Sequence, residues 1–390
     1  MRFAFLSQGK LFVSRPGAAP ALIESTFGQE LRETHQRIQQ KNQWKRNSSG
    51  AQFAAWGGGA NFDPASVPVQ ISGITGGGKA SSLVYALNTD TFGGLFSYDL
   101  EEKAELRLFH KNDFSLHEVH RHPVDSTTYV CCREYRDGSA RIAVSESEGR
   151  RLSDVTEGDS RDESPAWIPG RERSLLFQSA GMGRNQNGDL VGLGPYSIQS
   201  LDLVSGRHET LLEDDRIDYL SPRMDEAGNL YCIRRPYEDP TQRRASFSTF
   251  MLDIICFPYR FLRAIFCFFD VFSKLFTGKA LANSRQAPGG TRNADLKRMV
   301  LYGRLLDVEK AQQSKQGAPG EQSLVPKTWE LIRLSPDGKK DVIDSGVMSF
   351  DLLPGGALLI CNGSAISTLS KDGSHELLHR DKLITKVVSL

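Results

Sequence analysis

Short apolar runs separated by turn residues recur along the chain at a regular spacing. The run ESPAWIPGRERSLLFQSA, residues 163–180, combines a short strand pattern, a Pro/Gly turn and a second apolar strand pattern. HEVHRHPVDSTTYVCCRE, which starts at His117, superposes on it with an offset of 46 residues. A further copy starts at Ser72, two such offsets upstream of Ser164. Further copies start at Ser221 and Ser349. Five copies of one unit are therefore visible, which indicates a repeat architecture.

Each copy continues with a third, alternating strand, a charged turn and a fourth short strand, as in YSIQSLDLVSGRHETLLED. Four short strands per unit are typical of β-propeller blades, and the segments lack the 3.6-residue periodicity of helical repeats. The N-terminal segment supplies three strands and the C-terminal KLITKVVSL supplies one, so together they complete another blade and remove exposed sheet edges. We predict an all-β fold: a six-bladed β-propeller closed by its N- and C-terminal strands, with a helical insertion in one blade.

One repeat carries a family resemblance. LSDVTEGDSRDESPAWIPGRERSLLFQSA is similar to the TolB-type propeller repeat, with its polar turn, its S-P-x-W-x-P strand and the apolar strand that follows. SPRMDEAGNLYCIRR and LSPDGKK carry parts of the same pattern, whereas the copies at Ser72 and His117 keep the strand spacing but lack the Trp and the first Pro. The resemblance implies a TolB-like propeller. It implies little about function, because such propellers serve as binding platforms, accessory domains and occasionally enzymes.

Two insertions interrupt the repeats, so we divide the chain accordingly. The propeller is expected over 1–27, 68–236 and 327–390. Residues 28–67 form a first insertion with a polar helix over 29–43 and a Ser/Gly/Ala-rich loop; a solvated surface helix and a partner contact are both open. Residues 237–326 form a second insertion inside one blade, in which 294–312 could be a further helix.

The second insertion contains the most apolar stretch of the chain, FMLDIICFPYRFLRAIFCFFDVFSKLF, residues 250–276. Its five charged residues share an arc of about 100° on a helical wheel. We therefore expect an amphipathic helix over 248–278 with a wide apolar face and one narrow charged stripe. The expected membrane or partner contacts are Phe250, Phe257, Phe261, Leu262, Ile265, Phe266, Phe268, Phe269, Phe272 and Phe276, with Arg260, Arg263 and Lys274 at the headgroups.

Several placements of this helix compete. A transmembrane span is disfavoured because charges recur through its middle and because the chain must return to the blade it left. A helix lying in the membrane surface has neither difficulty. Docking on a protein partner or a second copy, and packing against the chain's own propeller, stay open.

Candidate chemistry is sparse. His117, His120 and His122 lie in LHEVHRHP, and on a strand the last two face the same way about 7 Å apart, a spacing that suits a metal site near a propeller channel. Surface or hydrogen-bonded histidines are the commoner interpretation. GITGGGK does not match a phosphate-binding loop, because the Ser or Thr after the Lys and the following helix are missing. RRAS at 243–246 could be phosphorylated beside the helix.

The composition restricts the expected partners and location of the protein but does not indicate a function. The net charge of +1 gives no global attraction to nucleic acid, so no nucleic-acid partner is expected. Six cysteines without a CxxC pair, and an N-terminus without a signal-peptide core, lead us to expect a cytoplasmic protein with reduced thiols.

The sequence hypothesis is a non-catalytic protein-binding scaffold, without a cofactor, that is peripherally attached to a membrane or membrane complex. The alternatives are a metal-dependent enzyme that uses His117, His120 and His122, and a subunit of a stable assembly or oligomer that uses the helix as its interface.

Overall fold

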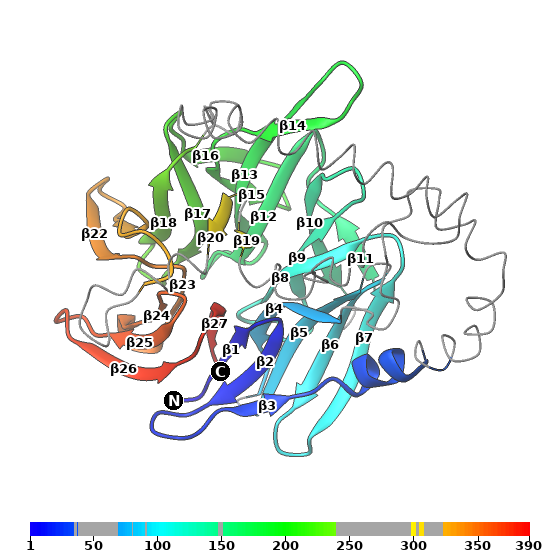
Figure 1. Cartoon of the computed structure of the whole chain (residues 1–390). Helices are drawn as coiled ribbons and strands as arrows, with labels where there is room; N and C mark the ends of the chain where they lie inside the picture. Colours follow the sequence, from blue (N-terminus) through cyan, green and yellow to red (C-terminus); the bar gives the residue numbers. More distant parts are fainter. Residues whose placement is uncertain are drawn as a thin grey trace, which may run out of the picture. The chain divides into compact units, whose positions relative to one another are not determined.

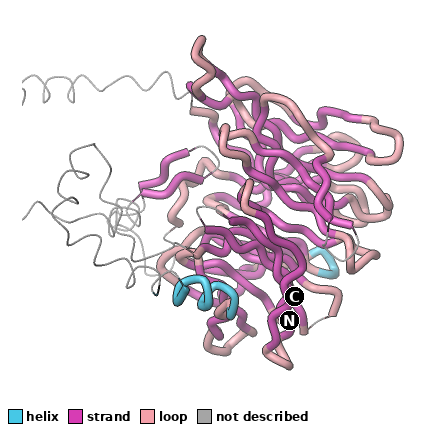
Figure 2. Tube along the Cα trace, turned by 90° about the vertical axis from the view of Figure 1, so that its right-hand side faces the viewer, coloured by secondary structure: helices cyan, strands magenta, loops and turns pink. Residues whose placement is uncertain are grey.

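The computed structural model describes residues 1–34, 37, 69–79, 81–89, 92–146, 151–238, 298–301, 304–307 and 323–390. Strands make up nearly all of the regular structure in these ranges (Figure 2). The chain divides into two compact units, Met1–Tyr237 with Lys310–Leu390, and Glu238–Glu309. The second unit lies within the predicted insertion 237–326.

The strands of the first unit form six groups of four, in each of which neighbouring strands pair antiparallel. Two of the groups share one nine-stranded sheet, because Ala140 and Arg161 pair in parallel between them. The groups are β27 (Ile384–Ser389), β1 (Phe3–Ser7), β2 (Lys10–Ser14), β3 (Ala21–Ile23); β4 (Gln70–Gly76), β5 (Ser82–Thr89), β6 (Phe92–Asp99), β7 (Ala104–Lys111); β8 (Ser115–Arg121), β9 (Tyr129–Glu134), β10 (Ala140–Glu146), β11 (Arg151–Asp154); β12 (Ser160–Trp167), β13 (Ser174–Arg184), β15 (Ser197–Asp202), β16 (His208–Leu212), with β14 (Leu190–Leu193) on β13; β17 (Ile217–Met224), β18 (Leu230–Pro236), β21 (Glu330–Leu334), β22 (Lys340–Ser345); and β23 (Ser349–Leu352), β24 (Leu358–Cys361), β25 (Ala365–Leu369), β26 (His375–Arg380).

The groups pack face to face, which explains why their strands are apolar on both sides. In β5, Leu83, Tyr85 and Leu87 join the apolar cluster shared with β1–β3, whereas Val84 and Ala86 join the cluster shared with β8–β10. Side chains of a strand alternate between its two faces, so a continuous apolar run is what a strand between two packed sheets requires. Equivalent clusters join the group of β8 to that of β12, the group of β12 to that of β17, and the group of β23 to that of β27 and β1.

The first strand of each group contacts the first strand of the next: β27 with β4, β4 with β8, β8 with β12, β12 with β17, β17 with β23, and β23 with β27. In Figure 1 the two chain ends lie together, where β27 pairs with β1. The β-propeller fold is confirmed. The count of six blades and the closure of the ring stay predictions, which this cycle of contacts supports.

The first insertion begins with a helix, described at 26–34 and 37, three residues earlier than the predicted start at 29. Ser25 explains the difference, because its hydroxyl accepts a hydrogen bond of 3.0 Å from the Gly28 N–H and so caps the helix. The carboxylate of Glu105 accepts from Ser25, Thr26 and the Phe27 N–H at the same end. Phe27 anchors the first turn against Phe92 and Phe96. The rest of the predicted helix lies outside the described residues.

The second insertion leaves the propeller after β18 and returns before β21, and these two strands pair directly from Leu230↔Leu334 to Arg234↔Glu330. Within the insertion the structure describes a hairpin, β19 (Arg298–Leu301) and β20 (Arg304–Asp307). The proposed helix over 294–312 is wrong at these residues. The two apolar runs flank Tyr302-Gly303, and two strand-like runs separated by a glycine-containing pair are typical of a hairpin. Within the described ranges, no helix is long and apolar enough to cross a membrane.

Candidate functional site

The first strands of the groups, which contact one another in turn, are called the inner strands below. Three of them share one backbone irregularity. Glu118 in β8, Ser164 in β12 and Ser221 in β17 have φ of 51°, 50° and 52°, and each stands at a shift of register. Non-glycine residues rarely adopt this left-handed conformation, and bulges of this kind re-aim the side chains around them. The three positions are separated by the same 46 and 57 residues that superpose the repeats in the sequence.

A network of charged side chains spans the strands that carry two of these bulges. The guanidinium of Arg161 donates to Oε1 of Glu134 at 3.0 Å and to Oε1 of Glu163 at 2.6 Å, and it also donates to the Gly138 carbonyl. Burial raises the pKa of Glu134, but His117 and Arg161 outweigh that effect and hold the pKa at about 2. Arg161 is thus the hub of the network.

The network continues inward through neutral groups. The other oxygen of Glu163 accepts from the Tyr196 hydroxyl at 2.9 Å and from the Gln178 amide at 3.2 Å. Burial and the charge of Glu163 raise the pKa of Tyr196 well above its ordinary value, so the phenol stays a donor. Gln178 in turn accepts from the Ser221 N–H at 2.7 Å, which ties β13 to the bulge of β17. These hydrogen bonds connect polar residues of three successive strand groups, those that begin with β8, β12 and β17.

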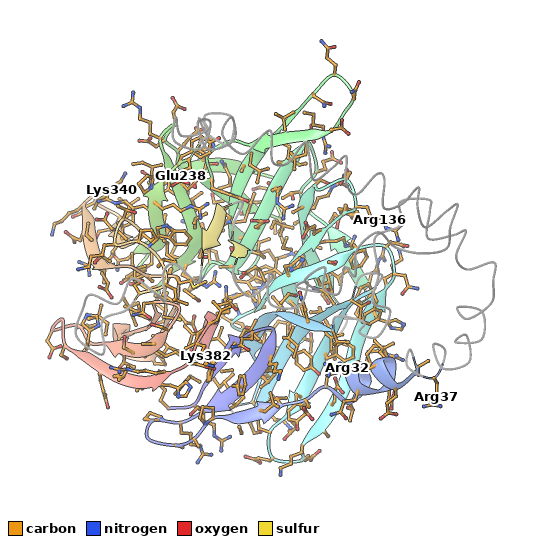
Figure 3. The ribbon with its side chains drawn as sticks, viewed as in Figure 1. Arg32, Arg37, Arg136, Glu238, Lys340 and Lys382 are labelled. Carbon is orange, nitrogen blue, oxygen red and sulfur yellow. The ribbon has the colours of Figure 1, made fainter. Side chains whose placement is uncertain are left out.

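A pocket of about 360 Å³ opens beside the network. It is lined by Gln70, Asn88, Thr89, Phe92, Asn112, Asp113, Phe114, Ser115, His117, Glu134, Tyr135 and Arg136. Figure 3 labels Arg136, which follows β9. Asn88 is already engaged, because its side-chain oxygen accepts from the Leu116 N–H at 2.9 Å and its amide donates to the Leu116 carbonyl. Amides, aromatic rings and a His–Glu pair suit a polar ligand with an aromatic or planar part.

The three histidines proposed as metal ligands have separate environments. Nε2 of His117 lies 3.1 Å from Oε2 of Glu134 at the pocket. Nδ1 of His120 accepts a hydrogen bond of 3.4 Å from the backbone N–H of Trp167. β8 ends at Arg121, and His122 follows it in a turn, where Nδ1 accepts from the Asp125 N–H at 2.9 Å and Nε2 lies 2.7 Å from the Glu172 carbonyl. In the described part of the chain, no group of three His, Cys, Asp or Glu side chains is placed to hold a metal ion.

Other predicted contacts lie elsewhere. The residues proposed for membrane or partner contact, all between Phe250 and Phe276, lie outside the described residues. Cys131, Cys132, Cys232 and Cys361 are buried and free, as expected, and burial raises the pKa of Cys131, Cys232 and Cys361 to about 12.

Sequence reasoning missed the network of Glu134, Arg161 and Glu163. The hint in the sequence was the group of charged residues at the start of the first strand of a repeat, in SRDESPAW. Charges at strand ends are common at sheet surfaces, so this hint became specific only when the neighbouring strands were in place.

Comparisons with known proteins agree with the fold. No protein-family model matches the chain, and no curated protein matches it. Among solved structures, TolB from Acinetobacter baumannii superposes with a TM-score of 0.51 at 10% identity, over 99% of this chain and 65% of that one. A chain of a nidogen/laminin complex superposes with a TM-score of 0.50 at 8% identity, over 99% of this chain and 97% of that one. Identities this low show the fold alone: the chain is a β-propeller that resembles TolB in its fold.

Proposed function

We propose that the protein is a non-catalytic binding scaffold that attaches peripherally to a membrane surface, or to a complex there, through residues 248–278. The observation that carries the proposal is the arrangement of charges in this segment. Asp253, Arg260, Arg263, Asp270 and Lys274 share one stripe of a helical wheel, and the remaining positions are mostly Phe, Leu and Ile. A helix of this composition favours the boundary between headgroups and acyl chains.

The placement of the insertion supports attachment rather than a single membrane crossing. The chain leaves β18 and re-enters at β21, and the two strands are hydrogen-bonded neighbours. One crossing would leave the returning chain on the far side of the bilayer, whereas a helix parallel to the surface returns without difficulty. The cytoplasmic location belongs to the same proposal.

The described polar groups support a role in binding. The carboxylates of Glu134 and Glu163 are held by Arg161, and Tyr196 is held as a donor. A general acid or base works best with a pKa near the operating pH, and the pKa of Glu134 at about 2 is far from that range. The pocket beside His117 is where we place a polar ligand or a partner's side chain.

Vesicle co-sedimentation tests the attachment. We expect the full chain to sediment with vesicles of phosphatidylcholine and phosphatidylserine and a 248–278 deletion to stay in the supernatant. Circular dichroism and thermal unfolding check that the deletion variant keeps its propeller. Equal sedimentation of both proteins refutes the tether.

Point variants separate the two faces of the segment. Replacing Phe261, Ile265 and Phe268 by Ser removes apolar contacts and should abolish sedimentation. Replacing Asp253 and Asp270 by Ser removes negative charge from the stripe, so binding to anionic vesicles should be retained or increased. A sharp oligomer peak in size-exclusion chromatography that is lost with the deletion, together with no vesicle binding, would instead identify a protein interface.

A further inference from the structure

The inner strands carry five acidic residues, and each is engaged within the protein. Their positions in β8, β12, β17 and β23 place them along the same inner edge of the strand groups. The pairs are Glu118 with Lys386, Asp162 with Ser179, Glu163 with Arg161, Asp218 with Arg235, and Asp351 with Ser389.

The basic residues of the same strands are not all matched. Arg161 and Lys386 have carboxylate partners, but among the described residues Arg121 and Arg223 have none. Among the described residues, the Arg121 guanidinium donates to the carbonyls of Gly76 at 3.2 Å and His122 at 3.0 Å. In the described part of the chain, the inner strands therefore hold two guanidinium groups that no carboxylate contacts.

Arg223 is the more unusual of the two. It is only 8% exposed, it donates to the Pro222 carbonyl at 2.8 Å, and its Nε has no hydrogen-bond partner in the described structure. A buried charge without a counter-charge is unfavourable, and a buried donor without an acceptor adds a further loss. Such a residue is best explained by a ligand that supplies the missing negative charge.

His120 supplies a neutral donor near these cations. It stands two residues after the bulge of β8, as Arg223 stands two residues after the bulge of β17, so the two occupy matching positions on their strands. Burial lowers the pKa of His120 well below its ordinary value, and the positive charges of Arg223, Lys386 and Arg121 lower it further. The ring is therefore neutral.

The tautomer of His120 follows from its one hydrogen bond. Nδ1 accepts from the Trp167 N–H, which leaves the proton on Nε2. Nε2 has no partner among the described residues, and His120 and Arg121 are both half-buried rather than fully covered. Both residues therefore keep some surface that is open to solvent.

We propose that the inner strands form a binding site for a small oxyanion, a phosphate or carboxylate group, held by Arg223, Arg121 and the Nε2–H of His120. Guanidinium groups match the two oxygens of such anions with paired N–H donors. The site is separate from the Glu134–Arg161–Glu163 network, in which each charged group has a partner of opposite charge, and it does not depend on membrane attachment.

Isothermal titration calorimetry of the full chain with inorganic phosphate, and separately with acetate, tests the site at constant ionic strength. Whichever anion binds identifies the group recognised. Arg223→Met keeps an unbranched side chain and removes the guanidinium and its charge, and it should weaken binding by at least about tenfold, which corresponds to one hydrogen-bonded charge contact. The control Arg216→Met removes the same charge from an exposed turn just before β17 and should leave the affinity unchanged.

A second pair of variants tests His120 without touching an arginine. His120→Gln keeps an N–H donor and should retain most of the affinity, whereas His120→Leu should weaken it severalfold. Thermal unfolding completes the test: Arg223→Met should not unfold below the wild type in anion-free buffer, because it removes an unbalanced buried charge. Binding of neither anion by the wild type, or equal binding by the wild type and Arg223→Met, overturns the proposal.

Discussion

The hub position of Arg161 makes it the most informative residue for stability. In Arg161→Met an unbranched side chain remains, but Glu163, whose side chain is 10% exposed, loses its counter-charge. Glu134, with a side chain 33% exposed, keeps only His117. Removing one partner of a buried ion pair leaves an uncompensated charge, which costs about 3–5 kcal/mol.

The two carboxylates contribute unequally to that loss. A pKa of about 2 for Glu134, against 4.5 as its ordinary value, sets a limit of about 3 kcal/mol for the net stabilisation of the ionised carboxylate, after the opposing effect of burial. That limit is shared between His117 and Arg161, and solvent screening reduces it because Glu134 is one-third exposed. We therefore expect the free energy of unfolding to fall by about 3–4 kcal/mol, mostly through Glu163.

The loss should depend on pH in a definite direction. The pKa of Glu134 is lower in the folded than in the unfolded chain, so its contribution is complete above about pH 4.5 and is lost as the pH falls toward 2. Arg161→Met raises the folded-state pKa of Glu134 toward its ordinary value. The difference between variant and wild type should therefore shrink on acidification through this window.

Urea unfolding followed by tryptophan fluorescence and circular dichroism, at pH 7 and at several values down to about 3.5, measures both effects. Arg207→Met is the matched control, because Arg207 pairs with Glu209 on an exposed hairpin and its loss should be small. Adding Glu163→Gln to Arg161→Met should recover part of the stability, because it neutralises the orphaned carboxylate. A loss below about 1 kcal/mol, as exposed ion pairs give, or one that does not change with pH, would refute the assignment of Arg161 as the hub.

Two further substitutions test local packing. Ser25→Ala removes the cap on Gly28 and a donor to Glu105, so the free energy of unfolding should fall by about 1 kcal/mol and the Gly28 amide should exchange faster with solvent. Ser25→Thr keeps a hydroxyl and should retain most of the stability. Unchanged exchange of the Gly28 amide in Ser25→Ala would contradict the capping role. Gly73→Ala places a methyl group 2.7 Å from the Glu118 N and 2.9 Å from the Val119 N, so thermal unfolding should show a loss of about 1–3 kcal/mol in stability. In the control Gly181→Ala the added methyl meets no atom within 4 Å, and the stability should hardly change. An unchanged stability of Gly73→Ala would show that β4 and β8 are not tightly packed.

Much of the fold was predictable because it depends on local patterns. The apolar run in the copy near Ser72 predicted a strand, and in the folded chain residues 83–87 of β5 alternate between two clusters. The repeat offsets of 46 and 57 residues matched the spacing of the three bulges. The pairing of the terminal strands β27 and β1 followed from counting strands in each repeat.

Predictions failed where a distant residue decides local structure. The first helix starts at 26 because Glu105, far along the chain, accepts from its first turn. The segment around β19 and β20 carries helix-forming Lys, Arg and Leu, yet pairs as a hairpin. The metal site on His117, His120 and His122 stays a prediction; in the described structure a bulge and the end of β8 give each histidine its own partners.

The sequence by itself determined the repeat, the strand order and the apolar faces of the blades, because hydrophobic periodicity and turn residues act over a few neighbouring positions. Only the folded chain decided which charges meet. Arg161 joins Glu134 and Glu163 across two strand groups, while Arg121 and Arg223 are left without a carboxylate among the described residues. Ion pairs require contact within a few ångströms, and that contact is set by the packing of whole sheets rather than by any short stretch of sequence.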